Sequence, residues 1–328
     1  MFRAWPRIAS FVTALLLSNA APVVAAAQEL NIVVTIRPIH SLTAAVMQGV
    51  SEPRLLVEGT ASPHTFVMKP SDAKALAGAN VLIRVAESLE PFTAKVIPSL
   101  PKQVQVVTLE ATPGLTLYPL RTGATFEAHE HGPAHKGHGH AHGPKSQNQK
   151  GTSSGGTDGH IWLDPENAKL IARHVADVLS AAAPAHADRF RANAAALATR
   201  LDALGPELAD MVKPVVGRNY LVFHDAYQYF ERRYGLTPAG SVTISPDVPA
   251  SAKRIVALRR KVADLKVTCV FAEPQFTPKL IDPIIEGTTA RRGILDPLGA
   301  AIPAGPEHYF GLMRGLANDL RACLANPA

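Results

Sequence analysis

Short apolar runs alternate with helical patterns along most of the chain. The runs are rich in Val, Ile and Leu, as expected of strands that are buried on both faces of a parallel sheet. Between them, apolar residues recur at helical spacing, and Gly or Pro mark the ends. This alternation on both sides of a midpoint predicts an α/β fold with two parallel-sheet domains. We expect strands at 31–36, 81–85, 104–109, 220–223, 242–244, 267–272 and 294–295, and helices at 41–47, 71–77, 226–234, 251–265 and 278–288.

The segment that joins the two halves is itself predicted to be helical. Asp164 is a good N-cap with Pro165 at the first helical position, so a helix begins there. Over residues 190–211 apolar residues recur in steps of three and four, which predicts a helix of about 25 residues and about 38 Å. Pro206 should kink or split this helix. The predicted organisation is an N-terminal domain at 28–185, a long rigid linking helix at 186–213 and a C-terminal domain at 214–328.

Between residues 120 and 159 the chain shows neither the apolar runs of strands nor the apolar spacing of helices. The stretch is mostly Gly, His, Lys, Ser and Thr, and it has too few apolar side chains to order itself, so we expect a disordered loop with a function. It contains six of the 13 histidines of the chain: His129, His131, His135, His138, His140 and His142. We expect this His-rich loop to bind metal more weakly than ligands on rigid strand ends, because its backbone must be ordered on binding.

The first 27 residues have the pattern of a cleavable export signal. Two arginines precede an apolar run of about ten residues, and Ala25 and Ala27 form an A-x-A cleavage site. The alternative is a membrane anchor, but polar residues interrupt the run before the roughly 20 residues that a span requires. We therefore expect a mature chain that starts at Gln28 and is soluble in the periplasm.

Composition excludes several classes of protein. The 328 residues are 47% hydrophobic and 18% charged, which argues against bulk disorder and allows about two domains. The net charge of +6 is spread thinly, without a Lys/Arg run or an aromatic–basic stripe. We therefore expect no nucleic-acid partner.

The cysteines of the chain are an even pair, Cys269 and Cys323. In an exported protein such a pair favours a disulfide over the alternative of two buried free thiols. The bridge would close a loop of about 55 residues, which the chain-entropy model values at about 4 kcal/mol.

Four candidate metal ligands stand at strand ends or in the loops that follow them: His64, His160, His224 and Asp296. In open α/β sheets the carboxyl ends of the strands face the ligand crevice, so two ligands from each half would meet between the domains. Imidazole nitrogens with one carboxylate oxygen suit tetrahedral Zn²⁺ better than Mn²⁺ or Mg²⁺. Each residue also has a structural alternative, an ordered surface or core histidine or, for Asp296, a turn before Pro297. Spacing alone leaves the zinc site a hypothesis.

The residues around these candidates are more specific. The stretches GTASPHTFVMKPSD (59–72), DGHIWLDP (158–165), YLVFHDAY (220–227), CVFAEPQF (269–276) and LDPLG (295–299) follow one another in this order. Together they resemble the zinc-uptake solute-binding proteins of ABC transporters, the ZnuA type, over most of the mature chain. The resemblance implies two α/β domains joined by a long rigid helix, a metal in the cleft between them, and His64, His160 and His224 as ligands. Manganese-binding relatives tend to have Glu where His224 stands, so the resemblance favours zinc.

The resemblance leaves the fourth ligand open. Some members of this family have Glu immediately before the first ligand, where this chain has Pro63. The candidates are Asp296, a water molecule and Glu273, and we favour Asp296.

The predicted function is capture of Zn²⁺ in the periplasm and its delivery to a membrane ABC permease with a cytoplasmic ATPase. We expect a monomer that catalyses nothing itself. The alternatives are the same fold loaded with Mn²⁺ or Fe²⁺, a zinc buffer or chaperone that works through the His-rich loop, and an exported zinc hydrolase. A hydrolase needs an open water position and a general base, and the sequence has no H-E-x-x-H motif and only Glu273 as an obvious base.

Overall fold

The computed structural model describes Met1 and residues 30–121, 156–243, 246 and 250–325. Residues 2–27 of the predicted signal segment and the six histidines of the His-rich loop lie outside these residues. Among the helices that are described, none combines the length and the apolar character that crossing a bilayer requires.

A parallel sheet with strand order β2-β1-β3-β4 forms the N-terminal half. Val33 and Leu82 pack on one face of the sheet with α2, while Ile32, Val34 and Ile83 face a larger apolar cluster on the other. Burial on both faces explains the uninterrupted apolar runs. The elements are β1 (Ile32–Val34), α1 (Arg37–Met47), β2 (Arg54–Leu55), α2 (Pro70–Ala77), β3 (Val81–Arg84), α3 (Phe92–Val96) and β4 (Gln105–Thr108).

The C-terminal half repeats this plan with a parallel sheet in the order β6-β5-β7-β8. Leu258 of α7 and Ile284 of α8 cover one face, where they pack with Leu221 and Val270 of the central strands. The elements are β5 (Tyr220–Val222), α6 (Gln228–Tyr234), β6 (Gly240–Ser241), α7 (Ala252–Asp264), β7 (Cys269–Ala272), α8 (Asp282–Ile285), β8 (Arg291–Ile294) and α9 (His308–Leu324). The predicted fold class, two parallel α/β sheets joined by a long helix, is confirmed.

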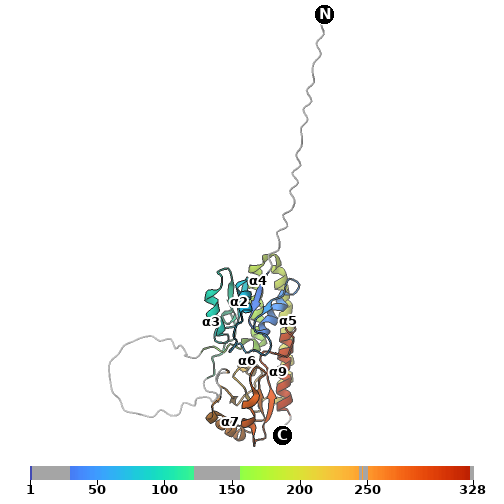
Figure 1. The fold of residues 1–328 in the computed structure, drawn as a ribbon. Helices are drawn as coiled ribbons and strands as arrows, with labels where there is room; N and C mark the ends of the chain where they lie inside the picture. The colour runs from blue at the N-terminus through green and yellow to red at the C-terminus, as the bar shows by residue number, and fades with distance from the viewer. Residues whose placement is uncertain (2–29, 122–155, 244–245, 247–249, 326–328) are drawn as a thin grey trace, which may run out of the picture.

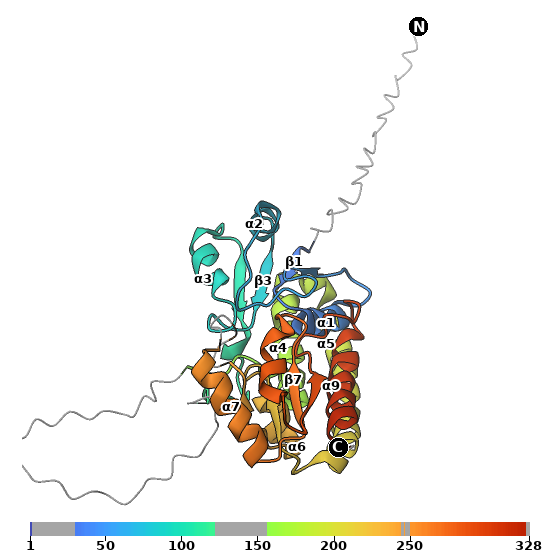
Figure 2. The ribbon, with the colours of Figure 1, turned by 60° about the horizontal axis from the view of Figure 1, so that its bottom comes forward.

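The helices α4 (Pro165–Ala182) and α5 (Ala187–Val212) connect the two sheets. α5 packs against α1, α4 and α9, and it runs beside α9 along one side of the molecule (Figure 1, Figure 2). A continuous apolar cluster extends from the N-terminal sheet along α5 to the C-terminal sheet. Of the kink or split expected at Pro206, the split is wrong, because α5 is continuous and the buried Leu204 and Leu208 hold the helix on both sides of the proline.

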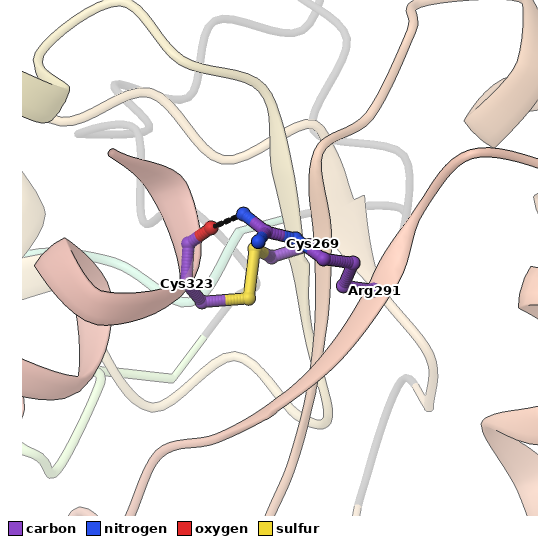
Figure 3. Close-up of a disulfide and its surroundings, with 3 residues drawn as sticks. All are labelled: Cys269, Arg291 and Cys323. Atoms are coloured by element: carbon purple, nitrogen blue, oxygen red, sulfur yellow. Dashed lines mark hydrogen bonds between the residues drawn. A yellow bond between two sulfur atoms is a disulfide. The ribbon is translucent and has the colours of Figure 1, made fainter. Parts of the chain in front are cut away.

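The predicted disulfide is confirmed, and the alternative of two free thiols is wrong. Cys269 on β7 is bonded to Cys323 on α9, with an S–S distance of 2.05 Å. Arg291 donates a hydrogen bond to the Cys323 carbonyl beside the bridge (Figure 3). Gly293 on β8 lies so close that a Cβ there would be 2.5 Å from the Phe271 ring, so only glycine fits against the bridged strand.

Several element boundaries differ from the prediction. The expected strand at 242–244 is wrong, since β6 ends at Ser241, and β8 begins three residues before the expected Ile294. Helices α3 and α9 were not expected. The expected loop at 120–159 is ordered at the ends that the structure describes, because Leu120 N donates to Gly156 O at 2.9 Å and Pro119 pairs with Thr157.

Candidate metal centre

The side chains of His64, His160 and His224 converge between the two halves. Each offers one ring nitrogen, and these atoms all lie within 4.8 Å of one another. The Nε2 atoms of His160 and His224 are 3.3 Å apart. In a tetrahedral zinc site with Zn–N bonds of about 2.0–2.1 Å, two ligand nitrogens are about 3.3–3.4 Å apart. The His160–His224 pair therefore already has the spacing of a zinc site, and His64 needs an approach of at most about 1.5 Å.

His64 lies on the loop between β2 and α2. Thr65 N donates to Ser62 O at 3.2 Å, and this turn presents the imidazole to the other two rings. Its Nε2 is buried and has no hydrogen-bond partner among the described residues. Burial, followed by the neighbouring His224 and His160, holds the pKa of His64 well below its ordinary value. The ring is therefore neutral at pH 7, the state in which imidazole binds a metal ion.

His160 is oriented by Asp158, two residues before it. One oxygen of this buried carboxylate, Oδ1, lies 2.7 Å from His160 Nδ1 and accepts a second hydrogen bond from His160 N at 3.0 Å. A carboxylate at this position keeps the ring proton on Nδ1, so Nε2 is the nitrogen left to coordinate. Between the two residues, Gly159 passes so close to Leu89 that a Cβ would be 3.0 Å from the Leu89 Cβ.

His224 is oriented by Glu273 in the same way. The two residues follow β5 and β7, which are neighbours in the sheet, so their side chains start from the same edge. The Glu273 oxygens lie 2.8 and 2.7 Å from His224 Nδ1. Burial alone would lower the pKa of His224, but the charge of Glu273 and its hydrogen bond outweigh burial, and the pKa is raised. Both His160 and His224 thus have the carboxylate support that is common for metal-binding histidines.

The three imidazoles line a small cavity of about 10 Å³, together with apolar side chains that include Trp162, Phe276 and Leu298. A cavity of this size holds one water-sized particle. Pockets that bind organic ligands measure about 300–1,000 Å³. The space between the histidines therefore suits a single ion.

Asp296, the fourth predicted ligand, is not brought into the described cluster of histidines. Its Oδ1 accepts hydrogen bonds from Gln275 Nε2 at 2.6 Å and Leu298 N at 3.0 Å, and its Oδ2 accepts one from Ala300 N at 2.6 Å. The carboxylate thus shapes the loop after β8, which is the turn alternative considered for it. Its effect on the cavity is indirect, through the position of Leu298.

Sequence reasoning missed the role of the two orienting carboxylates. Asp158 stands two positions before His160, and an acidic residue at this spacing from a candidate ligand is a signal for such support. Glu273 is a candidate ligand or base by its sequence, whereas in the structure its oxygens face His224 Nδ1. The six histidines of the His-rich loop lie outside the described residues.

Comparisons with known proteins agree with this geometry. Residues 32–323 match the family model described as zinc-uptake complex component A, periplasmic. The chain is 42% identical over 306 residues to the high-affinity zinc uptake system protein ZnuA of Brucella suis, covering 90% of this chain and 92% of that protein. It is 34% identical over 320 residues to ZnuA of Yersinia pestis, covering 98% of each.

Solved structures share the fold. A crystal structure of ZnuA superposes with a TM-score of 0.70 at 24% identity and covers 88% of this chain and 98% of its own. A mutant of the laminin-binding adhesin Lmb from Streptococcus agalactiae superposes with a TM-score of 0.71 at 25% identity, covering 90% of this chain and 99% of its own. These similarities extend over both sheets and the helices that join them.

Proposed function

Because the chain belongs to the ZnuA family of periplasmic zinc-uptake components, we propose that His64, His160 and His224 are the ligands of the zinc ion that it carries. The protein is a zinc-binding solute-binding protein of an ABC uptake system, located in the periplasm, and it is not an enzyme. Zinc is its transported substrate. The observation that carries the ligand assignment is the 3.3 Å separation of the His160 and His224 Nε2 atoms beside an unpartnered His64 Nε2 within the described structure.

Charge balance supports capture of a divalent cation at this place. Asp158 and Glu273 each bring a buried carboxylate to the outer nitrogen of one ligand ring. The two negative charges offset the charge of one Zn²⁺, so the ion can enter an apolar cavity without leaving a net buried charge. The carboxylates also make the two rings better electron donors to the metal.

We propose that a water molecule takes the fourth position around zinc. Asp296 would have to release hydrogen bonds from Leu298 N and Ala300 N before it could coordinate. Glu273 is held against the ring nitrogen of His224 that faces away from His160. Three protein ligands completed by a water molecule are an ordinary zinc arrangement.

Release requires that ligands on different halves separate. The loop that carries His64 follows Leu56 and Val57. Their backbone N–H groups donate hydrogen bonds to Val34 O and Thr35 O of the N-terminal sheet, at 2.9 Å each. His224 follows β5 of the C-terminal sheet. We propose that a change in the relative position of the halves draws His64 away and delivers zinc to the permease and its ATPase.

The processing and organisation of the chain are proposals as well. We propose cleavage after Ala27 and a monomer built of the domains 28–185 and 214–328 with the linking helix 186–213. We further propose that the His-rich loop binds additional zinc weakly through its six histidines. The described residues on either side of this loop pair with each other at Pro119 and Thr157.

Zinc-limited growth tests this function. A host that lacks its own zinc-binding component receives the chain together with its permease and ATPase genes, and growth is followed in medium that contains a zinc chelator. We expect growth with the wild type and with His186→Ala, which removes an exposed histidine, and no growth with His224→Ala. Growth of the His224→Ala strain at the wild-type rate would contradict the ligand assignment.

A further inference from the structure

The turn that carries His160 is fixed to a helix of the C-terminal half. This turn runs from Asp158 to Asp164, before α4, and its partners lie on α6. Gln228 Nε2 donates to Asp158 Oδ2 at 3.2 Å, and Tyr229 Oη donates to Asp158 O at 2.8 Å. At the other end of the turn, the Arg233 guanidinium binds both oxygens of Asp164, at 2.9 and 2.7 Å.

The Tyr229 hydroxyl also joins this turn to the stem of the His-rich loop, defined as residues 118–121 and 156–158. It accepts a hydrogen bond from Tyr118 N at 3.1 Å while it donates to Asp158 O. Asp158 N in turn donates to Tyr118 O at 2.9 Å. The buried phenol therefore closes a small ring of hydrogen bonds around the backbone of Asp158.

Every polar group of Asp158 is held by this arrangement. Its N–H donates to Tyr118 O, and its carbonyl oxygen accepts from Tyr229 Oη. Its Oδ2 accepts from Gln228 Nε2, which leaves Oδ1 for the ring and the backbone amide of His160. A carboxylate fixed at so many points has one orientation, and that orientation sets the direction of His160 Nε2. Tyr229 itself does not line the cavity between the histidines.

We infer that Tyr229 is a positioning residue for the zinc ligand His160, acting through Asp158. The inference rests on the proposed zinc site and adds a residue of the C-terminal half to its support. Tyr229 lies on α6, and Asp158 is the last residue of the stem. Zinc affinity therefore depends on the hydrogen bonds that hold the stem against α6.

Tyr229→Phe tests the inference, because it removes the hydroxyl and keeps the buried ring. Tyr234→Phe is the matched control on the same helix, since the Tyr234 hydroxyl has no hydrogen-bond partner among the described residues. We expect the zinc Kd of Tyr229→Phe to rise about two- to tenfold, since part of the effect of its two lost hydrogen bonds reaches the zinc site, and that of Tyr234→Phe to stay at the wild-type value. The visible absorption spectrum of Co²⁺ bound in place of zinc should change in Tyr229→Phe alone, because it reports the orientation of the ligands.

A double-mutant cycle separates positioning from a general loss of stability. On an Asp158→Ala background, Tyr229→Phe should cause little further loss of zinc affinity, because the carbonyl that Tyr229 bonds remains but the carboxylate that orients His160 is gone. Thermal unfolding of the metal-free variants shows whether each is folded. Wild-type zinc affinity and Co²⁺ spectrum in Tyr229→Phe, or an undiminished effect on the Asp158→Ala background, would overturn the inference while the zinc site stands. Weak zinc binding by the wild type itself would instead overturn the proposed function.

Discussion

Replacing Glu273 by Gln should weaken zinc binding although this residue is not a ligand. Gln has the same shape and can still offer an oxygen to His224 Nδ1, so the change removes the charge and little else. Residue Glu273 is 2% exposed, and both of its carboxylate oxygens lie within 2.8 Å of the ring nitrogen. Changes to such supporting groups typically reduce metal affinity by about 10–100-fold, which corresponds to about 1.4–2.7 kcal/mol.

The pH dependence of Glu273→Gln should differ from that of the wild type in a defined direction. In the wild type the carboxylate raises the pKa of His224 against the effect of burial. Protons therefore compete with zinc for His224 from a higher pH. Without the carboxylate, burial lowers this pKa and proton competition begins at a lower pH. The difference in affinity should be largest near pH 8 and should shrink towards pH 6.

Zinc titration against a competing chelator measures both effects. Trp162 is the tryptophan of the expected mature chain and its ring centre is 5.3 Å from that of His160, so its fluorescence can follow binding. Glu286→Gln removes an exposed carboxylate on the surface and serves as the control. A zinc affinity of Glu273→Gln equal to the wild type at pH 8, or a difference that grows on acidification, would refute the reasoning.

Three other changes have expected results. Replacing Cys269 and Cys323 by Ala should lower the free energy of unfolding in guanidinium by about 4 kcal/mol, because the bridge no longer restricts the unfolded chain. Glu90→Gln should flatten the pH dependence of stability, since burial raises the pKa of Glu90 to about 7. As the pH rises from about 4.5 to 7, the free energy of unfolding of the wild type should thus fall relative to that of this variant. The expected slope is up to about 1.4 kcal/mol per pH unit, measured by urea unfolding. Deleting residues 127–145 should lower the total zinc bound, by elemental analysis, and leave one tightly bound ion.

The three histidines could be predicted because each follows a strand or its loop within a specific stretch of residues. Parallel strands place their carboxyl ends on one edge, so His224 needs no further information to reach the cleft. The orientation of Asp296 towards its own loop has a local cause. Whether a carboxylate at a strand end faces the cleft or its own loop depends on the amides of Leu298 and Ala300, whose directions the spacing of residues does not reveal.

The supports of the site were harder to predict than its ligands. Tyr229 and Asp158 are 71 residues apart, and no local pattern pairs a helix phenol with a distant carbonyl. Helix α9 is different, since Tyr309, Leu312 and Leu316 recur at helical spacing and face the core. Its pattern was readable in the sequence. The bounds of β6 depend on which residues pair with β5, which is a property of the sheet.

The most direct test of the zinc site measures the stoichiometry and affinity of zinc binding in two variants. In each, two or three histidines outside the His-rich loop are replaced. One carries His64→Ala, His160→Ala and His224→Ala, and the control carries His174→Ala and His186→Ala, which lie on α4 and in the turn before α5. Calorimetric titration at pH 7.5 should show one tightly bound zinc in the wild type and the control and none in the triple variant, with the circular dichroism of all three unchanged. A tightly bound zinc that persists in the folded triple variant would contradict the assignment of these histidines as the site of capture.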